Sequence, residues 1–118
     1  TRKIFGDASI AIGITWVRIP VLGAHCMSVT FECEKPITPE EVRAIISKAP
    51  GCRVVDDPER NYFPMPVDAS GKDEILVGRI RRDLSDSTGR SISIFSAGDQ
   101  LLKGAALNAV QIAEKLLA

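Results

Sequence analysis

The sequence predicts a single α+β domain: a largely antiparallel mixed sheet with helices packed on one face. Residues 28–34 alternate polar and apolar side chains, as a half-buried strand does. Two more strand-like runs, 74–81 and 90–96, are joined by a short polar turn at 83–89. Helical patterns occupy 38–49 and 99–117. Strand pairs that follow one another without an intervening helix are typical of an α+β layer.

Length and composition limit both the domain number and the partners. A chain of 118 residues is long enough for one modest core. Its 15 basic residues balance its 15 acidic residues, so no nucleic acid or anionic membrane surface is expected as a partner. The three cysteines have no metal-ligand spacing and fit free thiols in a reducing compartment. We therefore expect a cytoplasmic protein without a bound metal.

The amino-terminal part is expected to lead into the sheet. Residues 1–15 indicate a short amphipathic start and then a loop, and residues 16–21 indicate a strand. Pro20 has no N–H to donate to a ladder, so this strand must lie at an edge or be bent or bulged. In the next strand the apolar face would be formed by Met27, Val29, Phe31 and Cys33.

The clearest local signal is the start of the first long helix. Thr38 is a capping residue, Pro39 occupies the first helical position, and Glu41 completes a capping box. Apolar residues then follow at helical spacing, and 50–51, Pro-Gly, end the helix. The acidic pair Glu40 and Glu41 suits the positive end of the helix dipole better than a catalytic role.

The middle of the chain is expected to hold strands and one long loop. Residues 52–55 form a short strand, and 56–74 are rich in turn formers. The acids near 56–59 do not have the spacing of a calcium loop, so no metal is predicted there. Arg79, Arg81 and Arg82 could form an anion patch, but an exposed strand face beside neighbouring acids explains these residues as well.

The last helix, 99–117, is predicted to close the domain. Asp99 can cap its start, and apolar side chains occur almost all the way round, which predicts that the helix is largely buried. Gly104 weakens a helix by up to about 1 kcal/mol relative to Ala, and close packing against another backbone would offset that cost.

The residues with the clearest chemistry lie between 16 and 26. His25 is the only histidine, and histidine is the side chain that titrates near neutrality, so it is a candidate acid or base, although a packed or surface role is the commoner one. Arg18, taken alone, is typical of an edge-strand or salt-bridged arginine. On an unbroken strand these two would face opposite sides, so only a bend near Pro20 or Gly23 would bring them together. Cys26 follows His25 directly, but neighbours on a strand point apart, which disfavours a Cys–His pair.

Four segments in the same order resemble aspartate-semialdehyde dehydrogenases. Residues 18–25 resemble that family's Arg-Val-Pro-Val…His signature, with RIPVLGAH in this chain. The other matching segments are VVDDPE at 54–59, DASGKD at 68–73 with VGRIR at 77–81, and GDQLLKGAALN at 98–108. Together they span almost the whole chain.

The resemblance implies an enzyme and a place within it. Members of the family reduce aspartyl phosphate to aspartate semialdehyde with NADPH, through a thioester on a cysteine, in amino-acid biosynthesis. By position, His25 would be the catalytic base, Arg18 would bind substrate and Gln100 would contact NADP. Residues 1–118 would be a carboxy-terminal fragment of the catalytic and dimerisation domain, in a homodimer or homotetramer, without the Rossmann domain that binds most of the cofactor.

Two alternatives remain open beside this interpretation. An N-acetylglutamyl-phosphate reductase has similar architecture and chemistry, although the run at 98–100 and the helix after it favour aspartate semialdehyde. The second alternative is a non-catalytic α+β module whose task is association. On the resemblance, the nucleophilic cysteine and the phosphate-binding residues would lie before Thr1, so the fragment alone is expected to be inactive.

Overall fold

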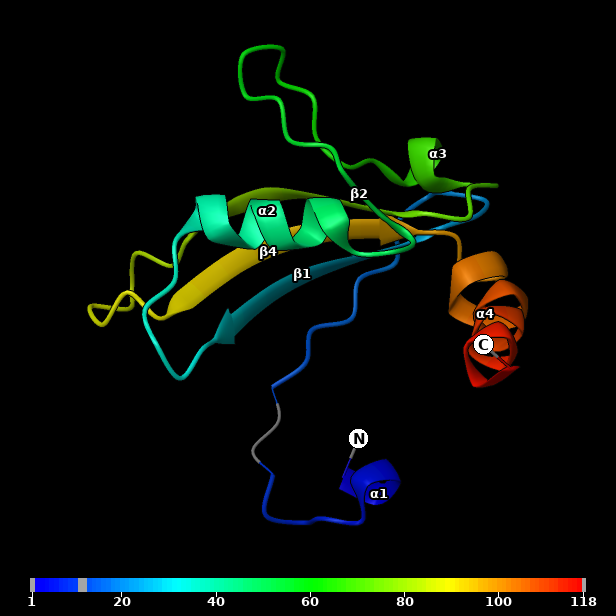
Figure 1. The fold of residues 1–118 in the computed structure, drawn as a ribbon, viewed down its shortest axis with the longest axis horizontal. Helices are drawn as coiled ribbons and strands as arrows, with labels where there is room; N and C mark the ends of the chain where they lie inside the picture. The colour runs from blue at the N-terminus through cyan, green and yellow to red at the C-terminus, as the bar shows by residue number, and fades with distance from the viewer. Residues whose placement is uncertain (1, 11–12, 118) are drawn as a thin grey trace.

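A four-stranded sheet forms the centre of the computed structural model, which describes residues 2–10 and 13–117. The spatial order is β1-β4-β3-β2 (Figure 1). The strands are β1 (His25–Glu32), β2 (Cys52–Val54), β3 (Ile75–Arg82) and β4 (Ser91–Gly98). β4 pairs antiparallel with both β1 and β3, and β2 pairs parallel with β3. The predicted α+β class with a largely antiparallel mixed sheet is confirmed, and the described residues contain no doubly wound Rossmann sheet.

One face of the sheet is covered by α2 (Pro39–Lys48), which lies in front of the strands in Figure 1 and contacts β2 and β3. Thr38 and Glu41 form the predicted capping box: the Glu41 N–H donates to the Thr38 hydroxyl at 3.2 Å, and the Thr38 N–H donates to the Glu41 carboxylate at 2.8 Å. The core beneath the helix centres on three buried residues, and half-buried apolar side chains of β1, β4 and α2 pack around them. The three are Val42, Ile80 and Ile92.

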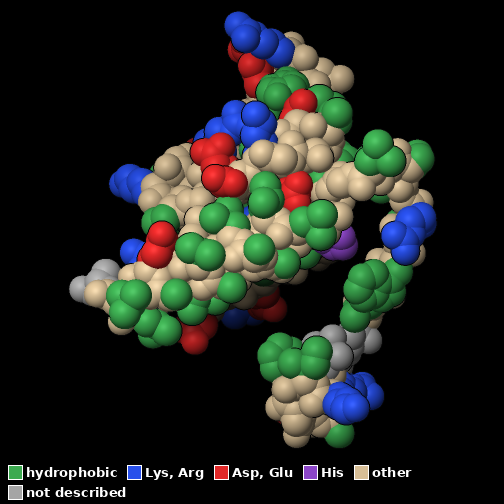
Figure 2. All heavy atoms as spheres, turned by 90° about the vertical axis from the view of Figure 1, so that its right-hand side faces the viewer, with side chains coloured by type: hydrophobic (Ala, Val, Ile, Leu, Met, Phe, Trp, Pro, Cys, Tyr) green, Lys and Arg blue, Asp and Glu red, His purple; other side chains and the backbone are tan. Residues whose placement is uncertain are grey.

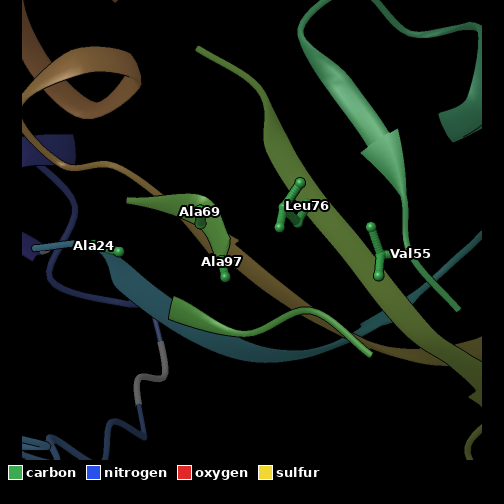
Figure 3. Packing of buried hydrophobic residues seen from close by; sticks show 5 residues of the cluster. All are labelled: Ala24, Val55, Ala69, Leu76 and Ala97. Carbon is green, nitrogen blue, oxygen red and sulfur yellow. The ribbon is translucent and has the colours of Figure 1, made fainter. Parts of the chain in front are cut away.

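The opposite face is covered at one end only. A single helical turn, α3 (Pro66–Ala69), lies in the stretch predicted to be loop, with Pro66 at its first turn. Its Ala69 is fully buried in a second cluster (Figure 3) with Ala24, Val55, Leu76 and Ala97. Small side chains meet there because several backbone segments approach closely, and Cys26 packs against the same cluster.

Four of the predicted strands are present, and their ends differ from the predicted ones by a few residues. The alternating strand begins at His25 instead of Ser28, and Met27 remains 49% exposed on the face that the alternation predicts to be buried. The strand predicted over 16–21 is wrong, because this segment pairs with no strand in the described residues. Trp16 and Val17 are 81% and 74% exposed, so apolar character there does not reflect a core position within this chain.

The two ends of the chain also differ from expectation. The described part of 1–15 includes a helical turn, α1 (Arg2–Phe5), where the sequence predicts a short amphipathic start and then a loop. Residues 1, 11 and 12 of that prediction lie outside the described residues. The predicted helix 99–117 begins as a π-helix, η1 (Leu102–Ala106), and continues as α4 (Leu107–Leu117). α4 lies beyond the end of the sheet (Figure 1), and none of its residues is buried, so the prediction of a largely buried helix is wrong.

Candidate functional site

A bend at 20–24 brings the chain into the sheet. Ala24 has φ +82° and is buried, and the Gly23 backbone lies against Ser70, so closely that a Cβ at position 23 would come within 2.9 Å of the Ser70 hydroxyl oxygen. A side chain at 23 would require the Ser70 hydroxyl, at the end of α3, to move. The positive φ of Ala24 just before β1 confirms the bend expected near Gly23.

His25 and Gln100 lie at the same end of the sheet. His25 is the first residue of β1 and pairs with Gly98, the last residue of β4. Gln100 follows two residues later, and both His25 and Gln100 are exposed. Figure 2, in which the one histidine is purple, shows the imidazole at the surface beside the gap between the sheet and the amino-terminal arm, residues 13–22. The register of β1 and β4 thus places two of the three predicted site residues at the same end of the sheet.

Asp99 fixes the turn that carries Gln100. Its carboxylate accepts hydrogen bonds from the N–H groups of Leu101 at 2.8 Å, Leu102 at 3.1 Å and Gly71 at 2.8 Å. The hydrogen bond from Gly71, followed by those from Leu101 and Leu102, lowers the pKa of the Asp99 carboxyl group. The sequence predicts the helix cap alone. The hydrogen bond from Gly71 joins residues far apart in the chain, so no local sequence pattern predicts it.

Arg18 is not brought into contact with His25. It lies exposed on the arm, which leads away from the sheet toward α1 (Figure 1). Within the described residues no hydrogen bond or ion pair joins the guanidinium group to the imidazole. The bend changes the direction of the chain between Arg18 and His25. No described residue is seen to hold the Arg18 side chain close to His25.

Cys26 has the properties of a packing residue. Its side chain belongs to the face opposite that of His25 and contacts the cluster around Ala97. Burial raises the pKa of its thiol, so the thiolate that a nucleophile needs is disfavoured. The described residues include no group of three or more His, Cys, Asp or Glu side chains placed to hold a metal ion. None of the described helices is long and apolar enough to cross a lipid bilayer.

The chemistry available at this sheet end is therefore proton transfer and polar binding. The exposed imidazole of His25 offers ring nitrogens that can donate or accept a hydrogen bond and can carry a proton. Gln100 offers one amide that both donates and accepts. Arg18 lies apart from this end of the sheet, on the arm, and its guanidinium group has the planar fork that binds carboxylates in two-point contacts.

Comparison with known proteins places the chain in a family. The model of the semialdehyde dehydrogenase dimerisation domain matches residues 1–103. The aspartate-semialdehyde dehydrogenase of Synechocystis sp. is 52% identical over 99% of this chain and 34% of its own length, and that of Aquifex aeolicus is 49% identical over the same shares. A crystal structure of aspartate semialdehyde dehydrogenase II from Vibrio cholerae, complexed with ASA, superposes with a TM-score of 0.80 at 41% identity, over 98% of this chain and 33% of that one.

This chain spans about a third of the length of the relatives it matches. The match to the family model nevertheless extends over most of the 118 residues, from the arm through the whole sheet and into η1. The chain belongs to the semialdehyde dehydrogenase family, through its dimerisation domain.

Proposed function

We propose that this chain acts as the carboxy-terminal third of an aspartate-semialdehyde dehydrogenase subunit, which reduces aspartyl phosphate to aspartate semialdehyde with NADPH in amino-acid biosynthesis. One observation carries the proposal: identity of 52% to such an enzyme runs over 99% of the chain and includes the segment that presents His25. The pairing of His25 with Gly98, beside Gln100, supports a shared site at that end of the sheet.

In this proposal His25 is the general base. The thioester chemistry of the family needs a thiolate, and an imidazole placed beside the thiol can accept its proton. The residue suits the task because its backbone is held by the first β1–β4 pair while its ring stays open to a reactant. The cysteine itself would come from a part of the subunit beyond these residues, since Cys26 is packed away from the site.

Arg18 is proposed to bind the substrate carboxylate. A guanidinium group can form two parallel hydrogen bonds with a carboxylate, which fixes both its position and its orientation. The apolar side chains of the arm that carries Arg18, including Trp16 and Val17, are exposed too. We infer that the rest of the subunit covers the arm and thereby moves or holds Arg18 against the site.

Gln100 is proposed to contact NADP, which would exchange a hydride with the substrate carbon when bound. The residue fits such a role to a limited extent: its amide is exposed and its turn is fixed by Asp99, so it can make one oriented polar contact. The phosphates and most of the cofactor would be held by the Rossmann domain of the same subunit. The subunit is proposed to work as a homodimer or homotetramer in the cytoplasm.

The alternatives differ in substrate or in activity. An N-acetylglutamyl-phosphate reductase would share the base and the thioester, but relatives at 49–52% identity bear the name of aspartate-semialdehyde dehydrogenase. A non-catalytic association module would need none of the three site residues. Both alternatives can be separated from the proposal by one assay.

The assay uses the full-length subunit that contains this chain. With phosphate, NADP and aspartate semialdehyde, the reverse reaction is followed by the absorbance of NADPH. We expect turnover with aspartate semialdehyde well above that with N-acetylglutamate semialdehyde. The opposite preference would identify the protein as an N-acetylglutamyl-phosphate reductase. If a folded subunit turned over neither aldehyde, the non-catalytic association module would be the remaining interpretation.

A further inference from the structure

Three segments that are distant in the sequence meet at the end of the sheet where His25 lies. They are the bend at 23–25, the segment 69–71 at the end of α3, and residues 97–99 at the end of β4. Each contributes one buried alanine to the same cluster (Figure 3): Ala24, Ala69 and Ala97. His25 follows the first of these alanines directly, so its backbone begins at this cluster.

The residue before His25 has an unusual backbone conformation. The φ of Ala24, +82°, lies in the left-handed region, which an alanine rarely adopts and which persists only where the surrounding structure holds it. Segment 69–71 belongs to those surroundings, because Ala69 shares the buried cluster with Ala24. A Cβ at Gly23 would come within 2.9 Å of the hydroxyl oxygen at position 70. Segment 69–71 therefore packs beside the bend that leads into β1.

The carboxylate of Asp99 joins segment 69–71 to the end of β4. Its two oxygens have separate partners. Oδ1 accepts from the N–H groups of Leu101 at 2.8 Å and Leu102 at 3.1 Å, whereas Oδ2 accepts from the N–H of Gly71 at 2.8 Å. Asp99 is only 8% exposed, so these hydrogen bonds lie largely out of water, where they are stronger. Oδ1 thus serves the turn before η1, and Oδ2 serves segment 69–71.

We propose that Asp99 is a positioning residue for His25: through the hydrogen bond from Gly71 it holds segment 69–71 against the bend at Ala24 and so sets the place of the imidazole. The inference rests on the proposed function, in which His25 is the general base, and adds a residue on which that base depends. Proton transfer requires the base within hydrogen-bond reach of its partner, so a small displacement of the ring lowers the rate.

The test replaces Asp99 with Asn in the full-length subunit. Asn has the same shape but only one oxygen, because an NH2 group takes the place of the other. Asparagine is a favourable helix cap, so the hydrogen bonds from Leu101 and Leu102 remain while the acceptor for Gly71 is lost. We expect the turnover number to fall about tenfold or more. The Michaelis constant for NADP should change little, because the turn that carries Gln100 is kept.

Asp86→Asn is the matched control. Asp86 is also a turn carboxylate that accepts backbone N–H groups, those of Thr88 at 2.7 Å, Arg90 at 2.9 Å and Ser91 at 2.8 Å. It lies in the turn between β3 and β4, at the opposite end of β4 from the pair formed with His25. The same substitution there should leave the turnover number at its wild-type value.

A double-mutant cycle tests whether Asp99 acts through His25. In the His25→Asn background, Asp99→Asn should lower turnover by less than about twofold, because the residue that it positions is gone. Unchanged turnover in Asp99→Asn alone, the same fold-loss in both backgrounds, or an equal loss in the control would overturn the proposal. A raised Michaelis constant for NADP without loss of turnover would also overturn it, because Asp99 would then serve only the turn of Gln100.

Gly71→Val is the decisive variant if Asp99→Asn does not fold. It keeps the Asp99 carboxylate, but a β-branched residue is strained at the φ of +71° found for Gly71, so the segment must shift. No atom lies within 4 Å of a Cβ at this position, so the effect comes from the backbone. The same loss of turnover is expected, and unchanged turnover would overturn the proposal. A folded wild-type subunit without turnover would instead refute the proposed function, and this role of Asp99 with it.

Discussion

Among the individual residues, His25 combines a fixed backbone with a free side chain. Its pairing with Gly98 and the buried Ala24 before it hold the main chain, while the ring remains exposed. A general base needs this combination, because it must keep its position and still reach a reactant. Asp99 gives Gln100 a comparable support through three backbone hydrogen bonds.

For Arg18, the prediction concerns the shape of the charged group. In the full-length subunit, Arg18→Lys should raise the Michaelis constant for aspartate semialdehyde strongly while the melting temperature stays unchanged. Lysine keeps the positive charge but loses the two-pronged fork that matches a carboxylate. Steady-state kinetics on both proteins check this. An unchanged Michaelis constant would assign Arg18 a structural role.

The site residues are recognisable in the sequence by type, whereas their relations come from the fold. His25 and Arg18 stand out because one is unique and the other lies in apolar surroundings. Their separation from one another, and the approach of Gly71 to Asp99, depend on contacts between distant segments. The same holds for Arg79, which has φ +54° and whose N–H donates to the Asp56 carboxylate 23 residues earlier in the chain.

Among the elements, α2 owes its start to two side chains. Thr38→Ala removes the hydroxyl that accepts from the Glu41 N–H and leaves that donor without its partner. We expect the free energy of unfolding of the full-length subunit to fall by about 1 kcal/mol. Urea denaturation followed by circular dichroism measures it. Ser47→Ala, near the other end of α2, serves as the control and should change little.

Turn carboxylates make the folded state sensitive to acid. Hydrogen bonds from neighbouring backbone and hydroxyl groups lower the pKa values of Asp83 and Asp86, and backbone hydrogen bonds lower that of Asp99. Their contribution to stability is complete above the unfolded pKa of about 4 and is lost as the pH falls through the lower folded values. The free energy of unfolding should therefore decrease below about pH 4. Asp86→Asn should reduce this decrease, and identical pH profiles for the two proteins would contradict the assignment.

Elements are predictable where a local pattern decides the structure. The capping box locates α2, and strict alternation locates β1 and β4. Apolar content gives a wrong prediction of burial where a segment has no packing partner within the chain. It predicts a strand at 16–21 and a buried helix at α4, yet both segments are exposed in the described structure. Residues can be apolar because they pack against something beyond these 118 residues.

As a whole molecule, the chain has its own core and carries the proposed base at one end of the sheet. Gln100 lies at the same end, and Cys26, next to the proposed base, faces the core. The isolated 118-residue chain should therefore show no dehydrogenase activity with phosphate, NADP and aspartate semialdehyde. The assay should use the full-length subunit as its positive control. Turnover by the chain alone, above a blank without protein, would show that these residues contain a nucleophile after all.

The proposed role of His25 as a general base is tested by replacing it with Asn in the full-length subunit. Asn keeps polarity and much of the volume but does not titrate near pH 7. Turnover should fall by about two to four orders of magnitude, and the low-pH limb of the rate profile should flatten. The melting temperature should stay within the error of the wild-type value. Equal rates, or a lost rate together with a collapsed melting temperature, would contradict this role and leave His25 a structural residue.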